Sequence, residues 1–161
     1  MKFVIEKATE NECEIILRLL TDLYLELGEE KESISYLSFD FIKQVLFSNV
    51  TEIYLAKVDT KCVGIFTLTE TQAIYAGGKY GVLDEMYITP SYRSQKIGQS
   101  IIKFISVAAQ NKKWNRIDVT APTETKWIRT QQFYHKNGFV FTGQKFKLNL
   151  QKEPKISNPN R

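Results

Sequence analysis

Apolar residues recur at helical spacing near the start of the chain. Over residues 8–27, aliphatic side chains stand three or four positions apart, at Ile15, Ile16, Leu19, Leu20, Leu23 and Leu27. This spacing puts them on one face of an α-helix, with Thr9 as the candidate N-cap and Gly28 as the residue that ends the helix. A polar loop follows, and a second, shorter helix is predicted near residues 39–48.

The middle of the chain is rich in β-branched and aromatic residues, which favour strands. Residues 51–59 and 61–75 predict a hairpin that turns near Asp59. A further strand is predicted over residues 79–88, after a turn at Gly77-Gly78, and Pro90 stops it.

Helices and short strands alternate in the last part. An isoleucine stripe predicts a helix from Ile97 to Ala109, residues 116–122 predict a strand, and residues 125–138 predict a helix that ends at Gly138. Residues 139–150 are expected to close the domain as one or two strands.

This order predicts an α/β (α+β) fold. We expect one domain over residues 1–150, with a mixed central sheet of six to seven strands flanked by about four helices. A length of 161 residues suffices for one domain with its own core. Residues 151–161, rich in Pro, Asn and Lys, are predicted to be a basic, disordered tail.

Composition and charge exclude only a few classes of function. The tail holds three basic residues and one acid, so it carries half of the net charge of +4. The small remaining charge disfavours nucleic acid as a partner. Because no apolar run reaches about 20 residues and no export signal is visible, we expect a cytoplasmic protein without a membrane partner. Cys13 and Cys62 are expected to be buried free thiols.

The nine residues from Tyr92 to Ser100, YRSQKIGQS, lie between a predicted strand and a predicted helix. A helix N-terminus presents unpaired N–H groups and a partial positive charge, which attract phosphate. Arg93 and Lys96 add charge that opposes the helix dipole unless an anion binds. The alternative is a basic helix cap without a ligand.

Residues 83–101, LDEMYITPSYRSQKIGQSI, resemble the signature of the GNAT superfamily of acyl-CoA-dependent N-acetyltransferases. Arg93 and Gly98 match the first position and the second glycine of its Arg/Gln-x-x-Gly-x-Gly/Ala motif, whereas Lys96 replaces the first glycine. Trp127 stands where many relatives have an asparagine. A second block, QQFYHKNGFVFTG, resembles the family's Phe-Tyr-x-x-x-Gly-Phe motif through Phe133, Tyr134, Gly138 and Phe139.

The resemblance implies an N-acetyltransferase that passes an acetyl group from acetyl-CoA, its cosubstrate, directly to a primary amine of a small molecule or peptide. It implies no metal. The pantetheine arm is expected along Met86, Tyr87 and Ile88. The pyrophosphate is expected on the loop and helix start formed by Arg93, Ser94, Gln95, Lys96, Ile97, Gly98, Gln99 and Ser100. Because a left-handed backbone would cost a lysine about 1–2 kcal/mol, we expect Lys96 to be helical, with its ammonium free to reach the phosphates.

Two residues are candidate catalysts. Tyr134 matches the family tyrosine that protonates the leaving thiolate, and its alternative role is a core aromatic residue. The second is a general base: of the two carboxylates on the strand beside the thioester, Asp84 and Glu85, the resemblance favours Glu85. Strand alternation is expected to turn Asp84 and Glu85 to opposite faces. A solvated carboxylate, with a water chain as the base, is the alternative. The single histidine, His135, is expected on the surface.

The acceptor side carries fewer signals. Tyr24, Glu29 and Glu30 are candidate substrate-binding residues, because an acidic and aromatic rim would attract a cationic amine. A solvated run of acids is the alternative. Two other functions stay open, namely a catalytically weak acyl-CoA-binding regulatory module and a toxin-like acetyltransferase acting on aminoacyl-tRNA. A homodimer stays open as well.

Overall fold

The computed structural model of the protein describes residues 2–143, 145–148 and 150. Three single 3₁₀ turns lie between its regular elements, η1 at Glu10–Glu12, η2 at Pro90–Tyr92 and η3 at Thr125–Trp127. The described strands and α-helices are β1 Phe3–Lys7, α1 Cys13–Leu27, α2 Phe39–Phe47, β2 Thr51–Val58, β3 Lys61–Ala73, β4 Gly78–Ile88, α3 Ile97–Asn111, β5 Ile117–Val119 and α4 Ile128–Lys136.

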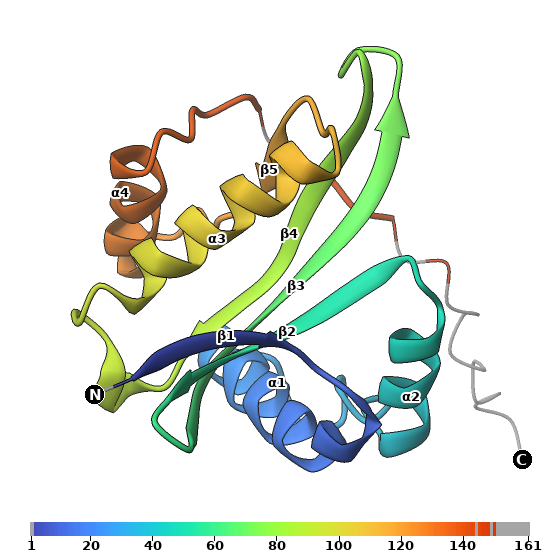
Figure 1. The fold of residues 1–161 in the computed structure, drawn as a ribbon, viewed down its shortest axis with the longest axis vertical. Coiled ribbons are helices and arrows are strands. Elements are labelled where there is room, and N and C mark those ends of the chain that lie inside the picture. The colour runs from blue at the N-terminus through green and yellow to red at the C-terminus, as the bar shows by residue number, and fades with distance from the viewer. Residues whose placement is uncertain (1, 144, 149, 151–161) are drawn as a thin grey trace, which may run out of the picture.

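The strands form one mixed sheet in the order β1-β2-β3-β4-β5. Neighbours from β1 to β4 are antiparallel, and β5 is parallel to β4. Helices α1 and α2 cover one face of the sheet, and α3 and α4 lie on the other (Figure 1). Ile65 packs with α1, while the next residue, Phe66, packs with α3. The sheet therefore has a separate hydrophobic core on each face. No helix within the described residues is long and apolar enough to cross a membrane.

The predicted count of six to seven strands is wrong, because the described residues form five. The additional strands were expected in residues 139–150. There the apolar side chains of Val140, Phe141, Phe146 and Leu148 are largely exposed, and the described residues pair with no strand. A strand in this sheet would have to bury alternate side chains on a covered face. The predicted tail, residues 151–161, lies outside the described residues.

The predicted turn residues and helix ends are confirmed, whereas the N-cap is not: Thr9 precedes the 3₁₀ turn η1, and α1 begins at Cys13. Gly28 has φ +93° and ends α1 in the left-handed conformation, with its N–H donating to the Leu25 carbonyl. Gly138 has φ +87° just after α4, and Gly77 has φ +72° in the turn before β4. Asp59, with φ +53°, turns the β2–β3 hairpin. Each residue thus supplies the positive φ that its turn requires.

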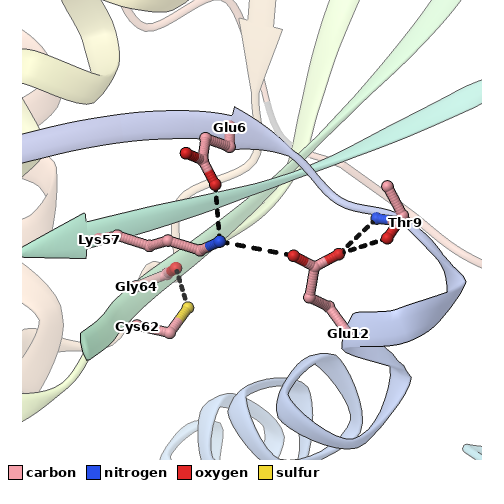
Figure 2. Close-up of polar contacts among 6 residues, drawn as sticks. All are labelled: Glu6, Thr9, Glu12, Lys57, Cys62 and Gly64. Carbon is pink, nitrogen blue, oxygen red and sulfur yellow. Dashed lines mark hydrogen bonds and ion pairs between the residues drawn. The ribbon is translucent and has the colours of Figure 1, made fainter. Parts of the chain in front are cut away.

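A polar cluster fixes the start of α1 against the sheet (Figure 2). Lys57 Nζ of β2 lies 2.6 Å from Glu6 Oε2 of β1 and 3.4 Å from Glu12 Oε1. The other Glu12 oxygen accepts hydrogen bonds from the Thr9 N–H at 2.8 Å and the Thr9 hydroxyl at 2.7 Å. The Thr9 hydroxyl, together with Lys57, holds the pKa of Glu12 below its usual value. Cys62, half-buried beside this cluster, is a free thiol.

Candidate functional site

β4 contains a β-bulge at its centre. The register between β3 and β4 shifts between Phe66 and Leu68, so that Asp84 and Glu85 together lie opposite Thr67. An extra residue in one strand breaks the alternation of its side chains. The bulge therefore changes the face that the second half of β4 presents.

The bulge turns both carboxylates to the α1 face of the sheet. Thr67 and Thr69 share a face, because they are two residues apart on β3. The Thr67 hydroxyl donates to the Glu85 carboxylate, and the Thr69 hydroxyl donates to Asp84 Oδ2 at 2.6 Å. The expectation that Asp84 and Glu85 point to opposite faces is thus wrong.

Two elements hold the Glu85 carboxylate. The Tyr24 hydroxyl of α1 donates to Glu85 Oε1 at 2.8 Å, and the Thr67 hydroxyl donates to Oε2. The Glu85 N–H in turn donates to Thr67 Oγ1 at 3.1 Å. Burial, and then the Glu85 charge, raises the pKa of Tyr24, so Tyr24 stays a donor at neutral pH. Sequence reasoning missed Thr67, which is only 3% exposed.

The predicted acceptor residues are only partly brought together. Tyr24 lies at Glu85. Glu29 and Glu30 are exposed in the turn after α1, where the Glu29 carboxylate accepts a hydrogen bond from the Ser33 hydroxyl at 3.0 Å. The acid that α1 does direct toward the expected cofactor loop is Glu26, which contacts Arg93.

The edge of β4 that faces β5 opens beyond the bulge. β5 pairs with β4 only over Gly81–Leu83 within the described structure, whereas β4 continues to Ile88. Backbone groups of Met86 and its neighbours along this edge thus lack a β5 partner. Tyr87 is buried on the α1 side, where burial, and then the charges of Asp22 and Glu26, raise its pKa. An open strand edge fits the amide groups of a pantetheine arm, which can extend the hydrogen-bonding pattern of a sheet.

The loop before α3 contains two left-handed residues. Ser94 has φ +62° and Lys96 has φ +63°. The prediction that Lys96 is helical is wrong, because α3 begins at Ile97 and Lys96 is its N-cap residue. The first α3 hydrogen bond runs from the Ser100 N–H to the Lys96 carbonyl at 3.0 Å. The N–H groups of residues 97–99 therefore precede the first intrahelical bond, and they are suited to an anion.

Arg93 is bound to α1. Its guanidinium donates to both carboxylate oxygens of Glu26, at 2.9 and 2.6 Å, and its Nε donates to the Ile88 carbonyl at 2.8 Å. It also lies over the Tyr87 ring, 5.4 Å from the centroid. Its expected role as a phosphate ligand would require the ion pair between Arg93 and Glu26 to break, because two N–H donors of the guanidinium are already bound to that carboxylate.

Gly98 has a packing role in α3. A Cβ placed on it would lie 3.1 Å from Phe133 Cζ of α4. The absence of a side chain thus lets α4 approach the start of α3 closely. The motif glycine therefore makes room for a neighbouring helix in addition to any ligand.

Tyr134 of α4 is buried, at 9% exposed. Its ring packs edge-to-face with Phe133 and Phe139, each at a centroid distance of 5.4 Å. Burial raises the pKa of Tyr134 to about 12, so its hydroxyl carries a proton at neutral pH. The neighbouring His135 is exposed, as predicted. Trp127 lies in η3, with Lys126 Nζ 5.6 Å from the centre of its ring. Within the described residues, no three His, Cys, Asp or Glu side chains gather into a group that could hold a metal ion.

Residues 49–141 match the family described as "Acetyltransferase (GNAT) domain". The match spans more than half of the chain. The protein belongs to the GNAT acetyltransferase family, and the resemblance drawn from the loop and the Phe-Tyr block is confirmed. No protein in a curated set matches the chain in sequence.

Solved structures show the same fold at low sequence identity. A ribosomal-protein-alanine N-acetyltransferase from Brucella melitensis biovar Abortus 2308 is 15% identical, with a TM-score of 0.76, over 93% of this chain and 100% of that one. An aminoglycoside acetyltransferase from an uncultured soil metagenomic sample, in complex with sisomicin, is 15% identical, with a TM-score of 0.75, over 94% and 97%. A predicted acetyltransferase with acetyl-CoA from Clostridium acetobutylicum is 17% identical, with a TM-score of 0.75, over 92% and 97%.

Proposed function

We propose that the protein transfers an acetyl group from acetyl-CoA to a primary amine of a small molecule or peptide. The observation that carries the proposal is the placement of the Glu85 carboxylate on the strand whose edge opens beyond β5. Family membership supports the acetyl transfer. The names of two similar structures, a ribosomal-protein-alanine N-acetyltransferase and an aminoglycoside acetyltransferase, support an amine acceptor.

Two segments of the chain would bind different parts of one acetyl-CoA molecule, which would supply the acetyl thioester. Residues 86–88 would bind the pantetheine amides through the backbone at the open edge of β4. The free N–H groups at the start of α3 would bind the pyrophosphate, because they combine unpaired donors with the positive end of the helix dipole. Lys96 adds a positive charge next to these donors.

Glu85 and Tyr134 would divide the proton transfers between them. Glu85 would accept the proton that the amine loses as its nitrogen bonds to the acetyl carbon. The Tyr134 hydroxyl would give a proton to the sulfur as the carbon–sulfur bond breaks. Glu85 lies on the α1 side and Tyr134 packs with the core on the α3 side, so the two groups would act from different faces of the sheet.

A panel of amines, assayed by release of free thiol from acetyl-CoA, tests the proposal. We expect at least one amine to release thiol, and Glu85→Gln to lower that rate about 100-fold. Asp84→Asn is the matched control, since it removes the neighbouring carboxylate. An equal loss in both variants would contradict the role of Glu85.

Thermal unfolding with acetyl-CoA separates binding from turnover. Acetyl-CoA at 100 times its Kd should stabilise the protein by about 2.7 kcal/mol. Stabilisation without thiol release from any amine would support the acyl-CoA-binding module instead. The absence of any stabilisation would refute acetyl-CoA as the cosubstrate.

A further inference from the structure

The Glu85 carboxylate accepts a hydrogen bond on each oxygen, from two different elements. Tyr24 comes from α1 and donates to Oε1 at 2.8 Å, and Thr67 comes from β3 and donates to Oε2. Because one donor lies on the helix and the other on the sheet, the carboxylate plane is fixed relative to both. A freely rotating glutamate would sample several rotamers.

The Thr67 hydroxyl both accepts and donates a hydrogen bond. Its oxygen accepts a hydrogen bond from the N–H of Glu85, and its O–H donates one to the carboxylate of the same residue. The N–H of a bulged residue cannot join the regular ladder, so this threonine stabilises the bulge that turns Glu85 toward α1. Aromatic residues and cysteine aside, it is the one buried polar side chain among the described residues.

We propose that Tyr24 and Thr67 are positioning residues that hold the Glu85 carboxylate in place for proton removal, and that Tyr24 acts through Glu85. This inference rests on the proposed function. It replaces the direct contact with the acceptor that the sequence suggested for Tyr24. Fixing a catalytic group in its productive geometry lowers the activation barrier, and a misplacement of about 1 Å costs on the order of 100-fold in rate.

A double-mutant cycle on kcat tests the inference. Tyr24→Phe keeps the ring and removes the donor to Oε1, so kcat should fall about tenfold, since a hydrogen bond to a charged group is lost. The KM for acetyl-CoA should be unchanged. In a Glu85→Gln background, Tyr24→Phe should have no further effect, because the basic carboxylate that Tyr24 positions is gone.

Variants of the two threonines supply the matched comparison. Thr67→Val removes the second donor and should lower kcat by a similar factor, whereas Thr67→Ser keeps the hydroxyl and should restore most of the rate. Thr69→Val, on the same face of the same strand, removes the donor to Asp84 and should leave kcat unchanged. If Thr67→Val does not fold, as judged by circular dichroism, the rate of Thr67→Ser and the Tyr24 double-mutant cycle test the inference instead.

Each failure identifies what is wrong. An equal loss on Tyr24→Phe with and without Glu85→Gln would show that Tyr24 acts on the acceptor independently, and would overturn the inference alone. Full activity of Glu85→Gln would refute Glu85 as the base. A wild-type protein that acetylates no amine would refute the proposed function, and the inference with it.

Discussion

Replacement of Lys96 by glycine should stabilise the protein, although it removes a side chain. Lys96 is exposed, and its φ of +63° lies in the left-handed region. That conformation costs an L-residue about 1–2 kcal/mol, while the greater freedom of glycine in the unfolded chain costs about 0.5–1 kcal/mol. With the middle of each range, the difference predicts a gain of about 0.75 kcal/mol. For a protein of this size, this corresponds to a rise in Tm of about 1.5–3 °C.

Lys113 provides the matched control, because it is an exposed lysine with φ +56° just beyond the other end of α3. Lys113→Gly should raise Tm by a similar amount. Urea unfolding of both variants, with and without acetyl-CoA, separates backbone strain from ligand binding. Only Lys96→Gly should weaken acetyl-CoA binding, if Lys96 meets the phosphates as proposed. A lower Tm for Lys96→Gly would refute the strain argument.

Three further outcomes follow from single contacts. Gly81→Ala should lower the free energy of unfolding by about 1–3 kcal/mol, because the new Cβ would lie 2.2 Å from a Trp114 ring carbon; urea midpoints check this, and a neutral result would contradict the close packing. The lowered pKa of Glu12, held by Thr9, contributes stability that is present above the unfolded value of 4.5 and is lost as pH falls below it. Glu12→Gln should thus flatten the acid limb of a plot of stability against pH, and an unchanged limb would exclude this contribution. Tyr134→Phe should lower kcat about 100-fold and leave acetyl-CoA affinity within about twofold, since the ring packing is kept; an unchanged kcat would remove Tyr134 from the mechanism.

Periodicity predicted most of the fold, because burial on one face leaves a repeat of 2 or 3.6 residues in the sequence. It could not predict the bulge at Glu85. The residues around it read as a regular strand, and the extra residue is visible only through its pairing with Thr67. Thr67 itself carried no signal, since one threonine in a β-rich stretch is typical of any strand.

The cofactor loop shows a different limit. The cost of a left-handed lysine led to the expectation of a helical Lys96, but the loop between β4 and α3 has Lys96 in the left-handed conformation. Such a strained residue persists where the surrounding structure outweighs its cost. The Arg93 contact was also beyond sequence reasoning. Its partner, Glu26, is 67 positions away in the chain, and no local pattern links the two.

The bulge makes the orientation of Glu85 depend on the length of β4 as well as on the residue itself. Loss of one residue from the Asp84-Glu85 pair would restore strict alternation across the strand. One carboxylate would then lie opposite Thr67, between Leu83 and Met86, where two lie now. Deletion of one residue of this pair would therefore change the site without replacing any other side chain. Transfer of this carboxylate to another scaffold would require the inserted residue together with the threonine opposite it.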